Sequence, residues 1–352
     1  MKKVCKETLR RLPKLIICTV TAVLLIIHPK EAAEGIREGL TLLASDVIPA
    51  IFPFMVLASY TFLSGAAQPL CRILKPLTVK ILRVSPAAAL AVIMGLAGGY
   101  PVGAKTVAEL YENKIITRNE AERLMFYCVN ASPAFTVSAV GMMCFGNIKK
   151  GLLLYGAVVL SSFTVGFFCR FLDDGKRLEA QCASAVKKNA FSQAVSGSAE
   201  AMLGISGWIL IFSALSRLAE LAPLDENTLI FVHAVCEVTT GCRSACAVVP
   251  LQFTGAMLGF GGFAVICQIT VYTDRCGIEL KRILSARLIN AALCAFYTNI
   301  LMKIFPEAVS TATQVSIGGR DFGIAHTAPV AAILMLMCAA LILEVDNRRK
   351  VC

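Results

Sequence analysis

The stretch GLAGGYPVGAK, Gly95–Lys105, interrupts an apolar segment that begins near residue 86. Gly98 and Gly99 permit backbone conformations that other residues avoid, and Pro101 lacks the amide hydrogen that a helix interior uses. Backbone polar groups inside a membrane must be paired, so such a break is tolerated only where it is buried in protein or lines a wet cavity. The stretch therefore predicts the tip of a re-entrant helical hairpin over residues 86–107.

The composition indicates an all-α, polytopic membrane protein. The 352 residues are 57% hydrophobic and 16% charged, which is more apolar side chain than a soluble domain of this length buries. The net charge of +11 comes from short basic clusters between apolar runs, so a lipid bilayer and no nucleic acid is the expected partner. The cysteines are scattered, the three histidines lie far apart, and no catalytic or nucleotide-binding motif occurs. We therefore expect no enzyme, no cofactor, no metal site and no disulfide framework.

About eight apolar runs are long enough to cross a membrane. They are residues 15–27, 40–63, 124–145, 152–172, 199–221, 252–272, 286–304 and 326–343. A cleaved signal peptide is the alternative for the first run, although the residues after it lack a clear cleavage site. Basic clusters stay on the cytoplasmic side, which places both termini there, together with the connections 71–83, 176–188 and 275–287.

Treating residues 229–249 as a second re-entrant hairpin keeps every basic connection except Lys149 and Lys150 on the cytoplasmic side. Five units result: 1–38, a first repeat over 39–173, a cytoplasmic linker over 174–195, a second repeat over 196–306, and an outer loop, last span and tail over 307–352. The repeats are inverted relative to each other, as in many secondary transporters. An ungapped pairing of Gly95–Lys105 with His233–Arg243 supports this, because Gly-Ala-Lys then falls on Gly-Cys-Arg.

Polar residues in and after the hairpins are the candidates for substrate binding, because ionisable groups and broken helices inside membranes are usually functional. Lys105 and Arg243 are expected to bind two carboxylates of a small organic anion. The alternatives are a Lys105–Glu109 pair, an internal Glu237–Arg243 pair, and kinks that serve packing alone. The candidates are Gly98, Gly99, Tyr100, Pro101, Gly103, Lys105, Asn130, Ser132, Glu237, Thr239, Thr240, Gly241, Arg243 and Gln268. The charged segment 109–123 is expected to be a solvated cytoplasmic face.

Several motifs together, GLAGGYPVGAK, IITRNEAERL, NASPAF, EVTTGCR and GFGGFAV, resemble the YlbJ type of sporulation integral membrane proteins. This group is part of the nucleoside-recognition, or Gate-domain, membrane proteins, and the resemblance runs from Gly39 to Phe305. It implies a role in spore formation, with transport of dipicolinic acid across the outer forespore membrane. It also implies a layout similar to the concentrative nucleoside transporter core, which has two hairpins and two broken helices.

Three functions follow as hypotheses. The leading one is transport of a small organic anion such as dipicolinate through a site between the hairpin tips. The second is transport of a nucleoside or other small solute with cation coupling, in which Glu237 matters more than the two cations. The third is a non-transporting membrane scaffold or assembly factor in sporulation. The sequence leaves open whether the chain forms a homo-oligomer.

Overall fold

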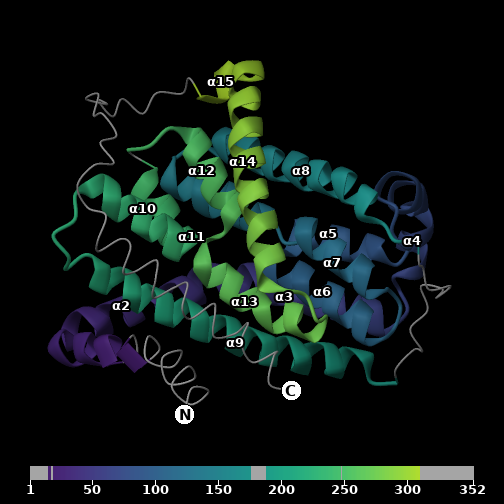
Figure 1. Cartoon of the computed structure of the whole chain (residues 1–352), viewed down its shortest axis with the longest axis horizontal. Helices are drawn as coiled ribbons and strands as arrows, with labels where there is room; N and C mark the ends of the chain where they lie inside the picture. Colours follow the sequence, from purple (N-terminus) through teal and green to yellow (C-terminus); the bar gives the residue numbers. More distant parts are fainter. Residues whose placement is uncertain (1–14, 17–18, 176–187, 247, 310–352) are drawn as a thin grey trace, which may run out of the picture.

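The computed structural model describes residues 15–16, 19–175, 188–246 and 248–309. Every regular element in these ranges is helical, which confirms the all-α class for the part of the chain that the structure describes (Figure 1). The last predicted span, 326–343, the tail and most of the basic N-terminus lie outside these ranges.

The elements follow one another with short connections. In chain order they are α2 (Pro29–Leu42), the π-helix η1 (Leu43–Val47), α3 (Ile48–Leu63), α4 (Gln68–Ile73), the π-helix η2 (Pro76–Leu82), α5 (Ala88–Gly98), α6 (Tyr100–Glu112), α7 (Arg118–Tyr127), the π-helix η3 (Ala134–Cys144), α8 (Ile148–Cys169), the 3-10 turn η4 (Arg170–Leu172), α9 (Ala190–Ala219), α10 (Glu226–Cys236), α11 (Val238–Ala245), α12 (Leu251–Phe260), α13 (Gly262–Arg275), α14 (Leu280–Ile304) and α15 (Pro306–Val309).

Four helical stretches of the described chain are long and apolar enough to cross a membrane, and they match four predicted spans. They are Ile148–Leu172, Ala190–Ala219, Leu251–Arg275 and Leu280–Ile304. The predicted span 40–63 lies in a helical run that already starts at Pro29 and contains the π-helix η1. The predicted span 124–145 is not continuous, because the helix breaks over residues 128–133.

A long antiparallel pair of helices borders the molecule, with α9 packed along α2 and α3 (Figure 1). Gly35 of α2 lies against the backbone of Ser213, and at the other end the rings of Tyr60 and Phe191 are 5.8 Å apart. Glycine permits this close approach, because a Cβ at residue 35 would lie 2.8 Å from backbone atoms of α9. Helix α9 begins at Ala190, within the predicted linker 174–195.

Both predicted hairpins are present as two packed helices with a break between them. In the first, α5 and α6 meet at Gly99, whose φ of 96° is a conformation that favours glycine. In the second, α10 and α11 meet at the extended residue Glu237. The ungapped pairing of the two halves sets Gly99 against Glu237, so it aligned the two break residues without the structure.

The helices that follow each hairpin are also interrupted where the sequence predicted. Residues 128–133 separate α7 from η3. Gly261 and Gly262, with φ of 85° and 76°, separate α12 from α13. The described chain thus has two hairpins, each followed by a broken helix.

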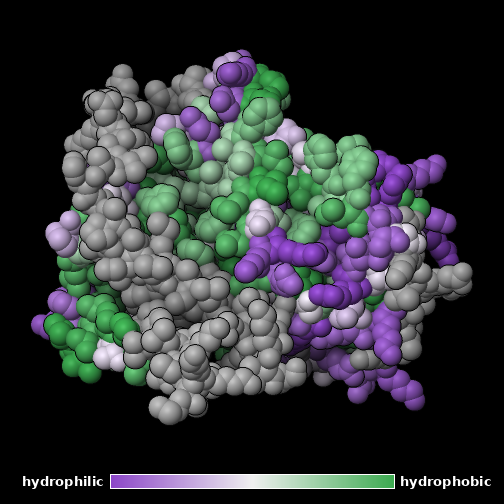
Figure 2. Space-filling view, viewed as in Figure 1, coloured by the Kyte–Doolittle hydropathy of each residue, from purple (hydrophilic) through white to green (hydrophobic). Residues whose placement is uncertain are grey.

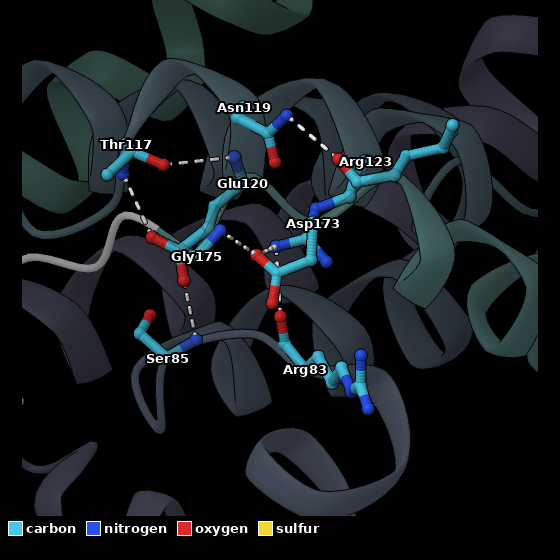
Figure 3. Close-up of polar contacts among 9 residues, drawn as sticks. Arg83, Ser85, Thr117, Asn119, Glu120, Arg123, Asp173 and Gly175 are labelled. Carbon is cyan, nitrogen blue, oxygen red and sulfur yellow. Dashed lines mark hydrogen bonds and ion pairs between the residues drawn. The ribbon is translucent and has the colours of Figure 1, made fainter.

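The prediction that residues 109–123 form a solvated face is wrong for their second half. Glu120 and Arg123 of α7 are buried. Glu120 accepts a hydrogen bond from the backbone N–H of Ser85 at 2.7 Å, and Arg123 pairs with Asp173 at 3.1 Å (Figure 3). Helix α7 therefore ties the start of the first hairpin to the end of α8.

The basic connections meet at one end of the molecule. Arg118 donates to the carbonyl of Gly277 at 2.6 Å, and Arg282 pairs with Glu122 at 2.6 Å. Hydrophilic residues gather at the end that includes α4, and hydrophobic residues cover α8 and α14 (Figure 2). This separation is consistent with the placing of these connections on one side of a membrane.

Nine described cysteines are free thiols and most are buried, as the sequence predicted. Cys71 of α4 differs, because it is disulfide-bonded. The expectation that no disulfide forms is therefore wrong at this residue.

Candidate functional site

The tips of the two hairpins line one cavity of about 330 Å³, the inner cavity. The π-helices η1 and η3 and the helices α3, α9, α11 and α13 complete its wall. Half of the predicted site residues line it: Gly99, Tyr100, Pro101, Ser132, Glu237, Thr239 and Gln268. The sequence therefore predicted the correct place for a cavity, although it could not give the chemistry inside.

Gln268 of α13 is the most exposed to this cavity in its chemistry. Its side chain is 7% exposed, lines the inner cavity, and has no hydrogen-bond partner among the described residues. A buried amide without a partner is costly. Ser132 is also buried there, and its hydroxyl accepts from the N–H of Phe135 at 3.2 Å, which leaves its own hydrogen available.

Glu237 holds the second hairpin in shape. Its two carboxylate oxygens accept from the N–H groups of Thr239 at 2.9 Å and Thr240 at 2.7 Å, and so cap the start of α11. The start of α6 in the first hairpin has no such side-chain cap. The predicted Glu237–Arg243 pair is not found among the described ion pairs, because the carboxylate is bound to α11.

A second, larger cavity of about 860 Å³, the outer cavity, adjoins the first. The two share five lining residues: Leu42, Ser45, Phe135, Ala139 and Thr239. The outer cavity carries the charges, which include Arg37, Arg217 and the exposed Arg243. Of the predicted site residues, it receives Thr239, Thr240 and Arg243.

Lys105 lines neither cavity, so the predicted meeting of Lys105 and Arg243 across a substrate does not occur. Its Nζ lies 3.1 Å from a carboxylate oxygen of Glu109 and donates to the hydroxyls of Ser59 at 2.5 Å and Ser198 at 3.3 Å. The alternative of a Lys105–Glu109 pair is thus the one observed. This pair joins α6 to α3 and α9.

Asn130 also has a structural task. Its amide donates to the carbonyl of Tyr127 at 2.7 Å and to Ser162 at 3.2 Å, and it lines neither cavity. Three predicted glycines serve packing within the hairpins. A Cβ at Gly103 would lie 2.8 Å from the Cα of Gly95, and Gly98 and Gly241 are equally crowded by Val102 and Ala234.

The sequence-based prediction missed Arg287, which it assigned to the basic connection 275–287. Arg287 lies on α14, is 1% exposed, and donates to the carbonyls of Val129, Gly259 and Phe260. Its guanidinium carbon lies 5.3 Å from the ring centroid of Tyr100, whose hydroxyl donates to the carbonyl of Leu258 at 2.6 Å. An arginine seven residues into an apolar helix was the available signal, since such residues are usually functional in membranes.

Comparisons with known proteins agree with the motifs. Residues 44–148 match the Gate family, described as nucleoside recognition, and this range runs from η1 to the start of α8. The chain is 26% identical over 325 residues to the sporulation integral membrane protein YlbJ of Bacillus subtilis strain 168, with 79% of each chain covered. No solved structure matches it significantly. The chain is thus an integral membrane protein with a Gate domain, similar to YlbJ, as its motifs predicted.

Proposed function

We propose that the protein is a transporter that binds a small, uncharged polar solute of the nucleoside class in the inner cavity. The observation that carries this proposal is Gln268, a buried amide without a partner in a cavity that both hairpin tips line. The volume of about 330 Å³ lies in the range of small-molecule sites. Inverted repeats with a midplane site between them are the usual frame for such transport.

The lining suits a nucleoside. The amide of Gln268 offers both donors and an acceptor, which can pair with the edge of a base, and Phe135 offers a ring for stacking. Glu237 keeps lone pairs beyond those that cap α11, and carboxylates often bind ribose hydroxyls. The family description, nucleoside recognition, supports the same class of solute.

Charge argues against a dianion in the inner cavity. Among the described residues that line it, Glu237 carries the one formal charge, and it is negative. A second and third negative charge beside a buried carboxylate, without a cation, would be strongly unfavourable. The cation pair expected from the sequence would have solved this, but Lys105 lies elsewhere.

Transport of dipicolinate is the second candidate, and Arg243 favours it. Arg243 lines the outer cavity and takes part in none of the ion pairs among the described residues. A guanidinium without a carboxylate can bind one from a solute in two parallel hydrogen bonds. Similarity to a sporulation membrane protein supports the same context, with cytoplasmic termini and the outer forespore membrane as the proposed location.

The test is uptake of labelled uridine and labelled dipicolinate by the full chain in proteoliposomes. The Gln268→Leu variant should bind uridine about tenfold more weakly without loss of thermal stability, because Gln268 has no partner within the protein. Gln252→Leu, on α12 and away from both cavities, is the matched control. Equal uridine binding by the two variants would refute the inner-cavity site.

Arg243→Gln separates the two candidates. It should lower dipicolinate uptake and leave uridine uptake unchanged if the anion uses the outer cavity. If neither solute is taken up and hairpin variants still support sporulation in a spore former, the scaffold hypothesis gains over both.

A further inference from the structure

The break after α7 releases carbonyl groups, and polar side chains already occupy them. A broken helix normally leaves its last carbonyls without partners, and in transporters such carbonyls are available to a coupling ion. Here the donors come from the break itself and from the neighbouring helices α8 and α14. They are Asn290 for the carbonyl of Phe126, Asn130 and Ser162 for that of Tyr127, and Arg287 for that of Val129.

The break after α12 is filled in the same way. The hydroxyl of Tyr100 donates to the carbonyl of Leu258 at 2.6 Å. Arg287 donates through Nη2 to the carbonyl of Gly259 and through Nε to that of Phe260 at 3.0 Å. The last three carbonyls of α12 thus all have donors, and two of them share one guanidinium.

Arg287 is the group that serves both breaks. It is 1% exposed, and none of the ion pairs among the described residues involves it. Its charge is balanced instead by carbonyl oxygens, by the negative end of α12 and by the face of the Tyr100 ring. A ring of carbonyl oxygens around a positive charge is also the surrounding that a bound monovalent cation needs.

We propose that Arg287 is a resident cation that fills the place which the two breaks would otherwise offer to a coupling ion. Solute binding between the hairpin tips is therefore independent of sodium at the breaks, and Arg287 holds the breaks and Tyr100 in one arrangement. This inference rests on the proposed function for its transport aspect. Its structural aspect, the replacement of a bound ion by a guanidinium, stands on the contacts alone.

The first experiment uses the purified full-length wild-type chain. Uridine binding and the midpoint of thermal unfolding are measured in sodium chloride and in choline chloride at equal ionic strength. Both should agree in the two salts, with dissociation constants within about twofold. A loss of affinity of about tenfold or more in choline chloride would overturn the inference while leaving the proposed function intact. Absence of uridine binding in both salts would contradict the proposed function instead.

The second experiment removes the guanidinium and needs no solute. Arg287→Gln should unfold at least about 5 °C below the wild type, because several buried carbonyls lose their donors. Arg282→Gln removes an exposed charge from the same helix and is the matched control. Millimolar guanidinium chloride or sodium chloride should raise the midpoint of R287Q above its value in choline chloride, and should leave R282Q unchanged. Equal midpoints for R287Q and R282Q, or no cation-specific rise in R287Q, would overturn the inference; the wild-type salt test decides if R287Q does not fold.

Discussion

Replacing Gly103 with alanine tests whether the first hairpin depends on close backbone contact. A Cβ at this position would lie 2.8 Å from the Cα of Gly95 and 3.0 Å from the carbonyl carbon of Cys128, and nearer still to the Cys128 oxygen. Carbon atoms in ordinary contact are about 3.5 Å apart, so α5 and α6 would have to separate by at least about 0.7 Å. All the obstructing atoms belong to the backbone, and no side-chain rotation relieves them.

Such overpacking costs about 2 kcal/mol, which corresponds to a fall of about 4–8 °C in the midpoint of thermal unfolding. The fluorescence of Trp208, the single tryptophan of the chain, can follow unfolding in detergent. The matched control is Gly204→Ala on α9, where a Cβ would meet no atom within 4 Å. Alanine is the better helix former there, so this control should be neutral or slightly stabilising. Equal midpoints for G103A and G204A would refute the close-packing account, whereas the expected result also predicts weaker uridine binding in G103A, because Gly99 lies one turn away.

Three further variants test other contacts. Glu237→Ala should cost about 1–2 kcal/mol by removing the cap of α11, and a thermal midpoint equal to that of Glu237→Gln would show that the cap contributes nothing. Lys105→Met should destabilise by about 2 kcal/mol, since Glu109 stays partly buried without its partner, and the double variant Lys105→Met/Glu109→Leu should regain stability in a double-mutant cycle. Arg123→Met should lower stability by about 3 kcal/mol in denaturant titrations and more than Asp173→Asn does, because it removes the buried partner that two elements share.

The breaks could be predicted from the sequence because they depend on local chemistry. Gly99, Gly261 and Gly262 have positive φ, and the sequence marked all three by glycine in an apolar run. The pairing of the two halves also held at the residue level, since Gly99 and Glu237 are both break residues that line the inner cavity. Four of the spans followed from length and hydropathy alone.

Partners in space could not be predicted in the same way. Lys105 was assigned to a substrate because its helix starts at a break, but the serines that surround it come from α3 and α9, far away in the sequence. Arg287 resembled one more residue of a basic connection, since only the packing of α14 against both breaks reveals its contacts. Glu120 sits in a charged stretch, and the amide of Ser85 that explains its burial lies 35 residues earlier.

The two hairpins share a frame but differ in the ends that they present to the inner cavity. The start of α6 faces it without a capping side chain, which favours hydrogen-bond acceptors, whereas Glu237 at the start of α11 favours donors. Gln268 and Ser132 add two further fixed points beside these ends. A solute held by such unlike points fits in one sense only, so the protein should distinguish a nucleoside from its mirror image even though its frame repeats one pattern twice.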